Sequence, residues 1–156
     1  MAAETPSLGG PHGGSRSYRP PPKNELVAAQ MSRMPRESTT PEILFRRALH
    51  AAGFRFRIHR RDLPGRPDVV LPRAKLAIFI DGCYWHACEI HGTLPKNNRE
   101  WWRAKFEENR KRDRRKDEAL RALGWTPVHF WEHEAVEHMV EVVHGLWNDR
   151  TGRAVH

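Results

Sequence analysis

The sequence IFIDGCYWHACEIHG at residues 78–92 decides both the fold and the chemistry of this chain. It begins as an apolar run that predicts a buried strand, and it breaks at Gly82 into a loop. The loop carries both cysteines of the protein, together with two histidines and two adjacent aromatic residues. The end of a strand and a group of soft metal ligands therefore fall in the same short segment.

Three residues of this loop have the spacing of a zinc site. Cys83, Cys88 and His91 follow a C-x4-C-x2-H pattern, short enough for one loop to wrap one zinc ion, which prefers sulfur and nitrogen ligands. A fourth ligand must come from elsewhere, and His133 is our candidate. The alternative is a pair of free buried thiols beside a solvated His91. A disulfide is disfavoured because nothing marks the chain as secreted.

His86 lies inside this loop and remains unused once four zinc ligands are assigned. A histidine that is held in place by its neighbours, and is not consumed by a metal, is free to transfer protons. We therefore expect His86 to be a catalytic residue.

The composition favours a polyanionic partner. The chain has 156 residues with 27 Lys and Arg against 19 Asp and Glu, a formal net charge of +8. An excess of this size suits nucleic acid, although it does not separate nucleic acid from anionic lipid. No apolar run approaches the roughly 18 residues of a membrane span, and the N-terminus lacks the apolar core of a signal peptide. We expect a cytoplasmic protein, associated with the nucleoid when bound to DNA.

The domain organisation follows from the distribution of Pro and Gly. Residues 1–30 are rich in both, have little apolar surface to bury, and predict a disordered tail. Residues 31–149 are long enough for one globular domain with its own core. Residues 150–156 form a short C-terminal tail.

The remaining patterns predict an α/β fold. A hydroxyl N-cap, a proline and an acid at residues 39–42 mark a helix start, and Gly53 marks its end. Alternation at residues 54–58 predicts a strand with one buried and one cationic face. The further expected elements are a hairpin of strands at 69–71 and 75–80, a helix at 98–123, a strand at 126–131 and a helix from residue 134. This order predicts a mixed central sheet flanked by helices.

The hairpin also predicts a catalytic metal site. Asp68 precedes its first strand and is brought near Ile80 and Asp81, at the end of its second strand. An acid on a sheet near a second acid, in a basic protein, suits a magnesium site that cuts phosphodiesters. The alternative for Asp68 is an ordinary turn residue before a strand.

Several separate motifs occur in one order along residues 31–147. They are MSR at 31–33, TPE at 40–42, LPGRPD at 63–68, FIDGCYWH at 79–86, Asn109, RD at 112–113, GW at 124–125 and WE at 131–132. In this order they resemble the Vsr, or very-short-patch-repair, DNA mismatch endonucleases, which have a restriction-endonuclease-like fold.

The resemblance implies a specific reaction. The family nicks the DNA strand 5′ to the thymine of a T:G mismatch, the lesion that forms when 5-methylcytosine deaminates. Its cofactor is Mg²⁺, and a zinc ion has a structural role. By similarity, the Asp68 carboxylate and the Ile80 backbone carbonyl bind Mg²⁺, and His86 is the general base that deprotonates the attacking water.

Further residues receive roles from the same resemblance. Asp113 matches an acid that orients the catalytic histidine, and Glu42 matches another acid of the active site. Tyr84 and Trp85 match an aromatic pair that wedges into the duplex beside the mismatch, where unstacking costs least; ordinary core packing is the alternative for this pair. Arg66 is expected to contact DNA. The structural zinc falls by similarity to Cys83, Cys88, His91 and His133.

Two features depart from the family pattern. Asp81 stands where the best-known members carry an active-site histidine, so either a second acid joins the metal site or the role of that histidine is absent. The zinc ligands also differ. Cys88 occupies a position that can be histidine, His91 is displaced by one residue, and His133 replaces a cysteine.

We therefore expect a Mg²⁺-dependent, zinc-stabilised, mismatch-specific nicking endonuclease. It would act as a monomer on double-stranded DNA, with mismatch-repair proteins as candidate partners and no membrane. Two alternatives remain. One is a nuclease of the same fold with another sequence or structure specificity, and the other is a non-catalytic zinc-stabilised DNA-binding domain that needs neither Asp68 nor His86.

Overall fold

The computed structural model describes residues 29, 33, 38–83, 86, 88–91, 94 and 96–153. The chain divides into two units, Met1–Arg33 and Met34–His156. Ala29 is the only residue of the expected tail at 1–30 that is described, so that expectation lies outside the described residues. All elements below belong to the second unit.

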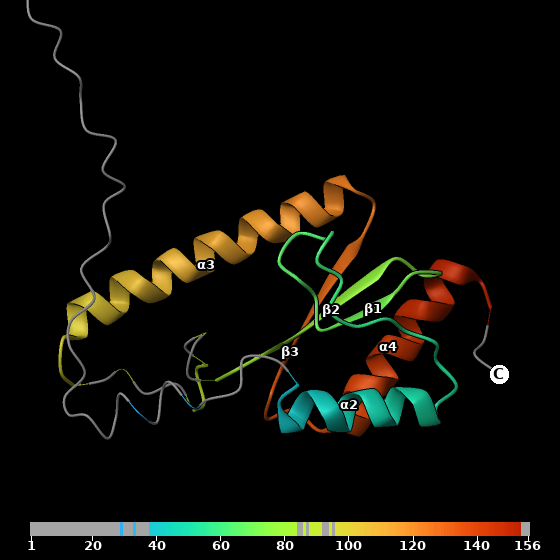
Figure 1. Cartoon of the computed structure of the whole chain (residues 1–156), viewed down its shortest axis with the longest axis horizontal. Coiled ribbons are helices and arrows are strands. Elements are labelled where there is room, and N and C mark those ends of the chain that lie inside the picture. The colour runs from blue at the N-terminus through green and yellow to red at the C-terminus, as the bar shows by residue number, and fades with distance from the viewer. Residues whose placement is uncertain are drawn as a thin grey trace, which may run out of the picture. The chain divides into compact units, whose positions relative to one another are not determined.

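The second unit is an α/β fold, as expected. Its elements are α2 (Thr40–Ala51), β1 (Val69–Leu71), β2 (Leu76–Asp81), α3 (Arg99–Ala122), β3 (Thr126–Trp131) and α4 (Val136–Thr151). The strands form one sheet in the order β1-β2-β3 (Figure 1). β1 pairs with β2 antiparallel and β2 pairs with β3 parallel, so the sheet is mixed.

Helix α2 begins where the sequence predicted, with a proline in its first turn. The Thr39 hydroxyl does not cap the helix as expected. The Glu42 carboxylate reaches back and accepts hydrogen bonds from the Ser38 backbone N–H at 2.7 Å and from the Thr39 hydroxyl at 3.1 Å. An acid at the third helical position thus satisfies donors ahead of the helix.

The expected strand at residues 54–58 is wrong. The segment makes one isolated antiparallel bridge, in which Arg57 and Val70 exchange backbone hydrogen bonds of 2.9 and 2.8 Å. β1, the strand it faces, has only three residues, and Ile58 is 41% exposed and is followed by a left-handed residue, His59 (φ 53°). The alternating pattern instead anchors an irregular segment through buried Phe54.

The sheet is covered on both faces. Successive strand residues point to opposite sides, so Val69 and Leu71 join one hydrophobic cluster and Val70 joins another. The first cluster packs under α2 and α4, which lie side by side (Figure 1). The second meets the C-terminal part of α3 at Leu120. Burial on both faces explains why β1 and β2 read as continuous apolar runs.

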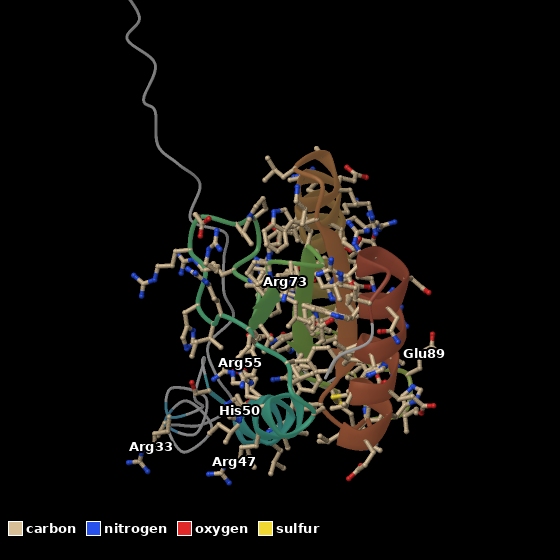
Figure 2. The ribbon with its side chains drawn as sticks, turned by 90° about the vertical axis from the view of Figure 1, so that its right-hand side faces the viewer. Arg33, Arg47, His50, Arg55, Arg73 and Glu89 are labelled. Carbon is tan, nitrogen blue, oxygen red and sulfur yellow. The ribbon has the colours of Figure 1, made fainter. Side chains whose placement is uncertain are left out.

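The outer surface of α2 and of the segment that follows it is basic. Arg47, His50 and Arg55 are exposed, and Figure 2 shows Arg47 extending outward from the helix. Of these residues, only Arg55 belongs to the cationic face expected for residues 54–58; Arg47 and His50 lie on α2, and the expected strand is absent.

Helix α4 continues to Thr151, so the expected boundary at residue 149 falls within it. Its last turn is tied to the sheet by Arg150, whose guanidinium donates to the Ala74 carbonyl and to the Thr126 hydroxyl. Among the described helices, none is both long enough and apolar enough to cross a membrane.

Candidate active site and metal-binding cluster

A pocket opens at the carboxyl ends of β2 and β3, between the sheet and α3. Its walls come from the loop before β1, the end of β2 and the loop after it, α3 and β3. The residues of the expected active site that line it are Arg66, Asp68, Ile80, Asp81, His86 and Asp113. Side chains from distant parts of the sequence therefore meet in one place.

Asp68 occupies a poorly solvated position in this pocket. Its carboxylate accepts a 2.8 Å hydrogen bond from the Ile80 backbone N–H. Burial raises the pKa of Asp68 to about 7, the Ile80 hydrogen bond opposes the rise, and the nearby Glu42 carboxylate adds to it. A carboxylate that is costly to ionise by itself is one that gains most from a bound cation.

His86 is oriented by a carboxylate of α3. Its Nδ1 lies 3.1 Å from Asp113 Oδ2, and its Nε2 lies 3.7 Å from Asp81 Oδ1. An ionised carboxylate only accepts hydrogen bonds, so Asp113 places the proton on Nδ1 and leaves the Nε2 lone pair free. Lys116 lies 3.2 Å from the other Asp113 oxygen and holds that carboxylate in turn.

His129 of β3 also lines the pocket and was not predicted from the sequence. His129 Nδ1 lies 2.7 Å from Asp81 Oδ2, and its Nε2 lies 3.0 Å from Asp117 Oδ1. A lone histidine in a strand has no spacing that marks it, and Asp117 is one acid within a charge run. The usable signal is the sheet register, because the parallel pairing sets His129 beside Phe79, two residues before Asp81.

Cationic side chains border the acids. Arg61, Arg66 and Lys116 line the pocket, and only Arg66 was expected there. The tight turn that delivers Arg66 has two consecutive left-handed residues, Gly65 (φ 79°) and Arg66 itself (φ 55°). Positive charge around half-buried carboxylates gives a pocket that can receive a phosphate next to a metal ion.

Glu42 takes a different place from the other expected acids. It does not line the pocket; it is 4% exposed and is bound by Arg46 Nη2 at 3.1 Å, besides its helix-capping bonds. The same Arg46 nitrogen lies 3.4 Å from the Asp68 backbone carbonyl. Glu42 therefore affects Asp68 in two ways: Arg46 connects the two residues, and the Glu42 charge raises the pKa of Asp68.

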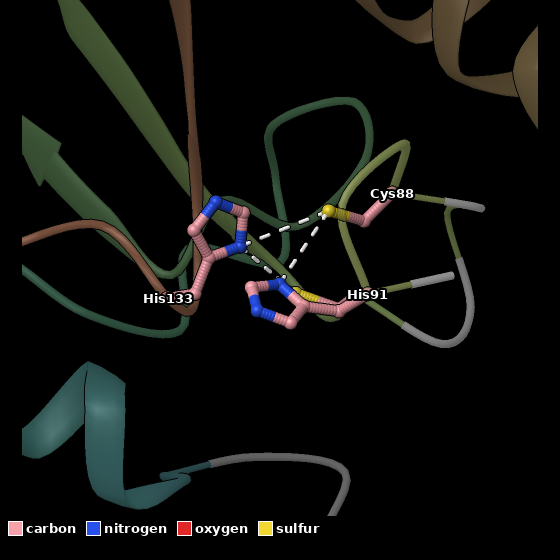
Figure 3. A group of neighbouring side chains, drawn as sticks. Cys88, His91 and His133 are labelled. Atoms are coloured by element: carbon pink, nitrogen blue, oxygen red, sulfur yellow. Dashed lines mark hydrogen bonds between the residues drawn. The ribbon is translucent and has the colours of Figure 1, made fainter. Parts of the chain in front are cut away.

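The four expected zinc ligands form a cluster next to the pocket. The ligand atoms of Cys83, Cys88, His91 and His133 all lie within 4.8 Å of one another. Figure 3 shows Cys88, His91 and His133 turned toward one another, from the loop after β2 and the segment after β3. Glu132, next to His133, accepts a 2.9 Å hydrogen bond from the Cys83 backbone N–H and ties the two segments together.

The cluster has the donor types and the approximate spacing of a tetrahedral metal site. Tetrahedral zinc, with Zn–S near 2.3 Å and Zn–N near 2.0–2.1 Å, holds its ligand atoms roughly 3.4–3.8 Å apart. The distances from Cys88 Sγ to the Nδ1 atoms of His91 and His133 are 3.9 and 3.8 Å, and Cys83 Sγ lies 3.9 Å from His91 Nδ1 and 3.0 Å from His133 Nδ1. Burial raises the pKa of the Cys83 thiol to about 11, and Cys88 and Glu132 add to the rise. A bound cation would stabilise the thiolates that this environment disfavours.

Tyr84 and Trp85, the expected aromatic wedge, lie outside the described residues. The loop that contains them leaves β2 at Asp81 and reaches Cys83 two residues later. Pocket and cluster thus share one short stretch of backbone.

Comparisons with known proteins agree with this geometry. Residues 23–91 match the family described as DNA mismatch endonuclease Vsr. The type II nicking enzyme V.XorIIP of Xanthomonas oryzae pv. oryzae is 46% identical over 106 residues, which cover 67% of this chain and 77% of that protein. The type II nicking enzyme V.NaeI of Lentzea aerocolonigenes is 37% identical over 136 residues, 81% and 82% of the two chains. The DNA mismatch endonuclease Vsr of Escherichia coli K12 is 38% identical over 86 residues, 54% of each chain.

A pocket of acids and histidines, in a chain this close to nicking enzymes, identifies an endonuclease that acts on DNA. The chain belongs to the Vsr family. Its mixed sheet with helices on both faces is the restriction-endonuclease-like architecture expected for that family.

Proposed function

We propose that this protein nicks double-stranded DNA 5′ to the thymine of a T:G mismatch, with Mg²⁺ as catalytic cofactor and zinc as structural ion. The observation that carries the proposal is the meeting of Asp68 and His86 on one pocket, with His86 Nδ1 held by Asp113 at 3.1 Å. The names of the related mismatch and nicking endonucleases support the substrate.

Asp68 and Ile80 would hold the magnesium ion. The Asp68 side chain supplies one oxygen, and the Ile80 backbone, fixed against Asp68 by the 2.8 Å hydrogen bond, supplies its carbonyl. The raised pKa of Asp68, about 7, supports this assignment because the buried carboxylate lacks full compensation by the protein alone. When bound there, Mg²⁺ supplies Lewis-acid stabilisation of the charge that develops on the phosphate.

His86 would act as the general base. With its Nδ1 proton directed to Asp113, the Nε2 atom accepts the proton of the attacking water. Asp113 stabilises the imidazolium that results, and Lys116 keeps that carboxylate in place. Arg61 and Arg66 at the rim would bind the phosphates that flank the cut.

The zinc ion would give this base its position. His86 lies between Cys83 and Cys88 in the sequence, so a metal that fixes the two thiolates fixes the backbone on both sides of the imidazole. We further propose that the catalytic domain, which includes all of α4, acts as a monomer, in the cytoplasm at the nucleoid.

A nicking panel tests the proposal. Duplexes of identical sequence carry a T:G pair, each other mismatch, or full pairing, with each strand end-labelled, and are incubated with zinc-loaded protein and Mg²⁺ or no added divalent cation. We expect one cut, 5′ to the mismatched thymine, only with Mg²⁺. Equal cutting of paired DNA would replace the T:G assignment by another sequence or structure specificity.

Paired variants make the panel specific. Asp68→Asn and His86→Ala should abolish nicking, whereas the exposed Asp149→Asn and His138→Ala on α4 should cut at the wild-type rate. Full activity in both Asp68→Asn and His86→Ala would eliminate the catalytic assignments. DNA binding without cutting under all conditions would favour the non-catalytic alternative.

A further inference from the structure

His129 is bound on both sides by carboxylates. Its Nδ1 faces Asp81 at 2.7 Å and its Nε2 faces Asp117 at 3.0 Å, while its ring stacks on Phe79 with centroids 4.8 Å apart and planes 12° apart. Ionised carboxylates accept hydrogen bonds and do not donate them, so both ring nitrogens must carry protons. The geometry thus requires an imidazolium.

The charge balance agrees with this protonation state. Burial opposes the charge, but the hydrogen bonds to Asp81 and Asp117 outweigh it and raise the pKa of His129 to about 9. The His129 side chain is 34% exposed, and Arg121 Nη2 lies 3.9 Å from Asp117 Oδ2.

The bridge through His129 runs parallel to the contact that orients His86. Asp81 ends β2 and His86 lies in the loop that follows it, while Asp113 and Asp117 are four residues apart on α3 and share one helix face. One link is Asp81 to His129 to Asp117, and the other is His86 to Asp113. Both links join the end of β2 to the same face of α3.

We propose that His129 is a positioning residue of the nicking reaction: by joining Asp81 to Asp117 it holds α3 at the end of β2 and thereby fixes the contact between Asp113 and His86. The inference rests on the proposed function of His86 as the base. It also gives Asp81 a role, because its Oδ2 atom is bound to His129 and only Oδ1 faces His86, at 3.7 Å.

Electrostatics explains why a cation is needed between these acids. Asp81, Asp113 and Asp117 crowd one wall of the pocket, and Lys116 pairs with Asp113 alone among them. Without the imidazolium, Asp81 and Asp117 would repel each other across the gap between β2 and α3. Separation of the two elements would draw Asp113 away from His86.

The test uses the zinc-loaded full chain and a pair of variants. In His129→Gln the amide donates to Asp81, but its oxygen faces the Asp117 carboxylate, so one link is lost. In His129→Gln/Asp117→Asn the new amide donates to the Gln oxygen and both links are restored. We expect His129→Gln to lower kcat for the T:G duplex roughly 10- to 100-fold, with KM nearly unchanged, and the double variant to recover most of the loss.

Two spectroscopic measurements accompany the kinetics. The downfield NMR signal of the His86 Nδ1 proton bound to Asp113 should be lost in His129→Gln and return in the double variant. In the wild type, nitrogen shifts should show a doubly protonated His129 ring at neutral pH. A neutral ring, or wild-type kcat in His129→Gln, or an inactive double variant with an intact fold, would overturn the inference. A wild-type protein that nicks nothing would instead overturn the proposed function, and the His129 nitrogen shifts would still be readable.

Discussion

The Asp68 carboxylate and the Ile80 backbone are joined across the β1–β2 hairpin by a 2.8 Å hydrogen bond from the Ile80 N–H to Asp68 Oδ2. The bond fixes a side-chain oxygen beside the carbonyl-bearing end of β2. It only partly offsets the burial that raises the pKa of Asp68.

Asp68→Asn should abolish nicking and stabilise the fold at high pH. The folded-state pKa of Asp68, about 7, lies above its ordinary value near 3.9, so stability falls as pH rises from about 4 through 7. Removal of the charge should therefore raise the free energy of unfolding at pH 8, without added Mg²⁺, by on the order of 1–3 kcal/mol. Denaturant melts at pH 4 and pH 8 check this, and equal wild-type and variant stability at pH 8 would contradict it.

Added Mg²⁺ provides the complementary control. At pH 8 it should raise the melting temperature of the wild type and leave that of Asp68→Asn unchanged, because only the wild type has the carboxylate to bind it.

Asp113→Asn should slow nicking by roughly 10²-fold, since the amide does not stabilise the imidazolium of His86 or define its tautomer as a carboxylate does. Substrate affinity should change little, because Asp113 contacts His86 and Lys116. Single-turnover rates with the T:G duplex measure the effect. Glu118→Gln, an exposed acid on the same helix, is the control, and an undiminished rate in Asp113→Asn would remove the orienting role.

The sequence predicted the elements that have strong local signals. The strand at 126–131 was predicted correctly because Gly124 ends the preceding helix and Val128, Phe130 and Trp131 favour a strand after it. The strand at 54–58 failed for a non-local reason: its alternation is real, but β1 is too short to extend the single bridge at Arg57 and Val70.

Site residues within sequence motifs could be predicted, whereas those brought together by the pairing of the strands could not. Asp68, His86 and the Cys/His cluster lie within short motifs, so their meeting could be anticipated. His129 and Asp117 come together only once β2 and β3 pair in parallel and α3 packs over them. No spacing along the chain encodes that arrangement.

Cys83→Ser should release zinc and destabilise the protein by several kcal/mol, because metal binding and folding of the loop are coupled. Native mass spectrometry gives the metal content, and thermal melts give the stability. Ile90→Ser is the matched control, since Ile90 lies in the same loop, is 74% exposed and is no expected ligand. One zinc ion per chain retained in Cys83→Ser would count against the ligand set.

The free energy of unfolding contributed by protonated His129 should decrease as the pH rises. Its folded-state pKa of about 9 exceeds the ordinary value near 6.5, so the contribution is complete below pH 6.5 and is lost as pH rises through 9. Because the ring is partly exposed, we expect on the order of 1 kcal/mol. Unfolding free energies of wild type and His129→Gln should converge over this range, and a constant difference would contradict the assigned charge.

Gly65→Ala should disturb the turn that delivers Arg66. Gly65 has φ of 79°, and an added Cβ would meet Lys116 Cδ at 3.1 Å and Phe79 Cε1 at 3.2 Å. We expect a loss of about 1–3 kcal/mol in stability and slower nicking. Gly145→Ala in α4 is the control, because its added Cβ meets nothing within 4 Å; it should be neutral or stabilising. Equal stability of the two variants would contradict the close contact.

Only two residues separate Asp81, in the pocket, from Cys83, in the Cys/His cluster. An endonuclease that cuts undamaged chromosomal DNA harms the cell. Under the proposed function, the position of His86 depends on zinc bound at the adjacent Cys/His cluster. A chain that has not acquired zinc is therefore expected to leave DNA uncut rather than to cut it indiscriminately.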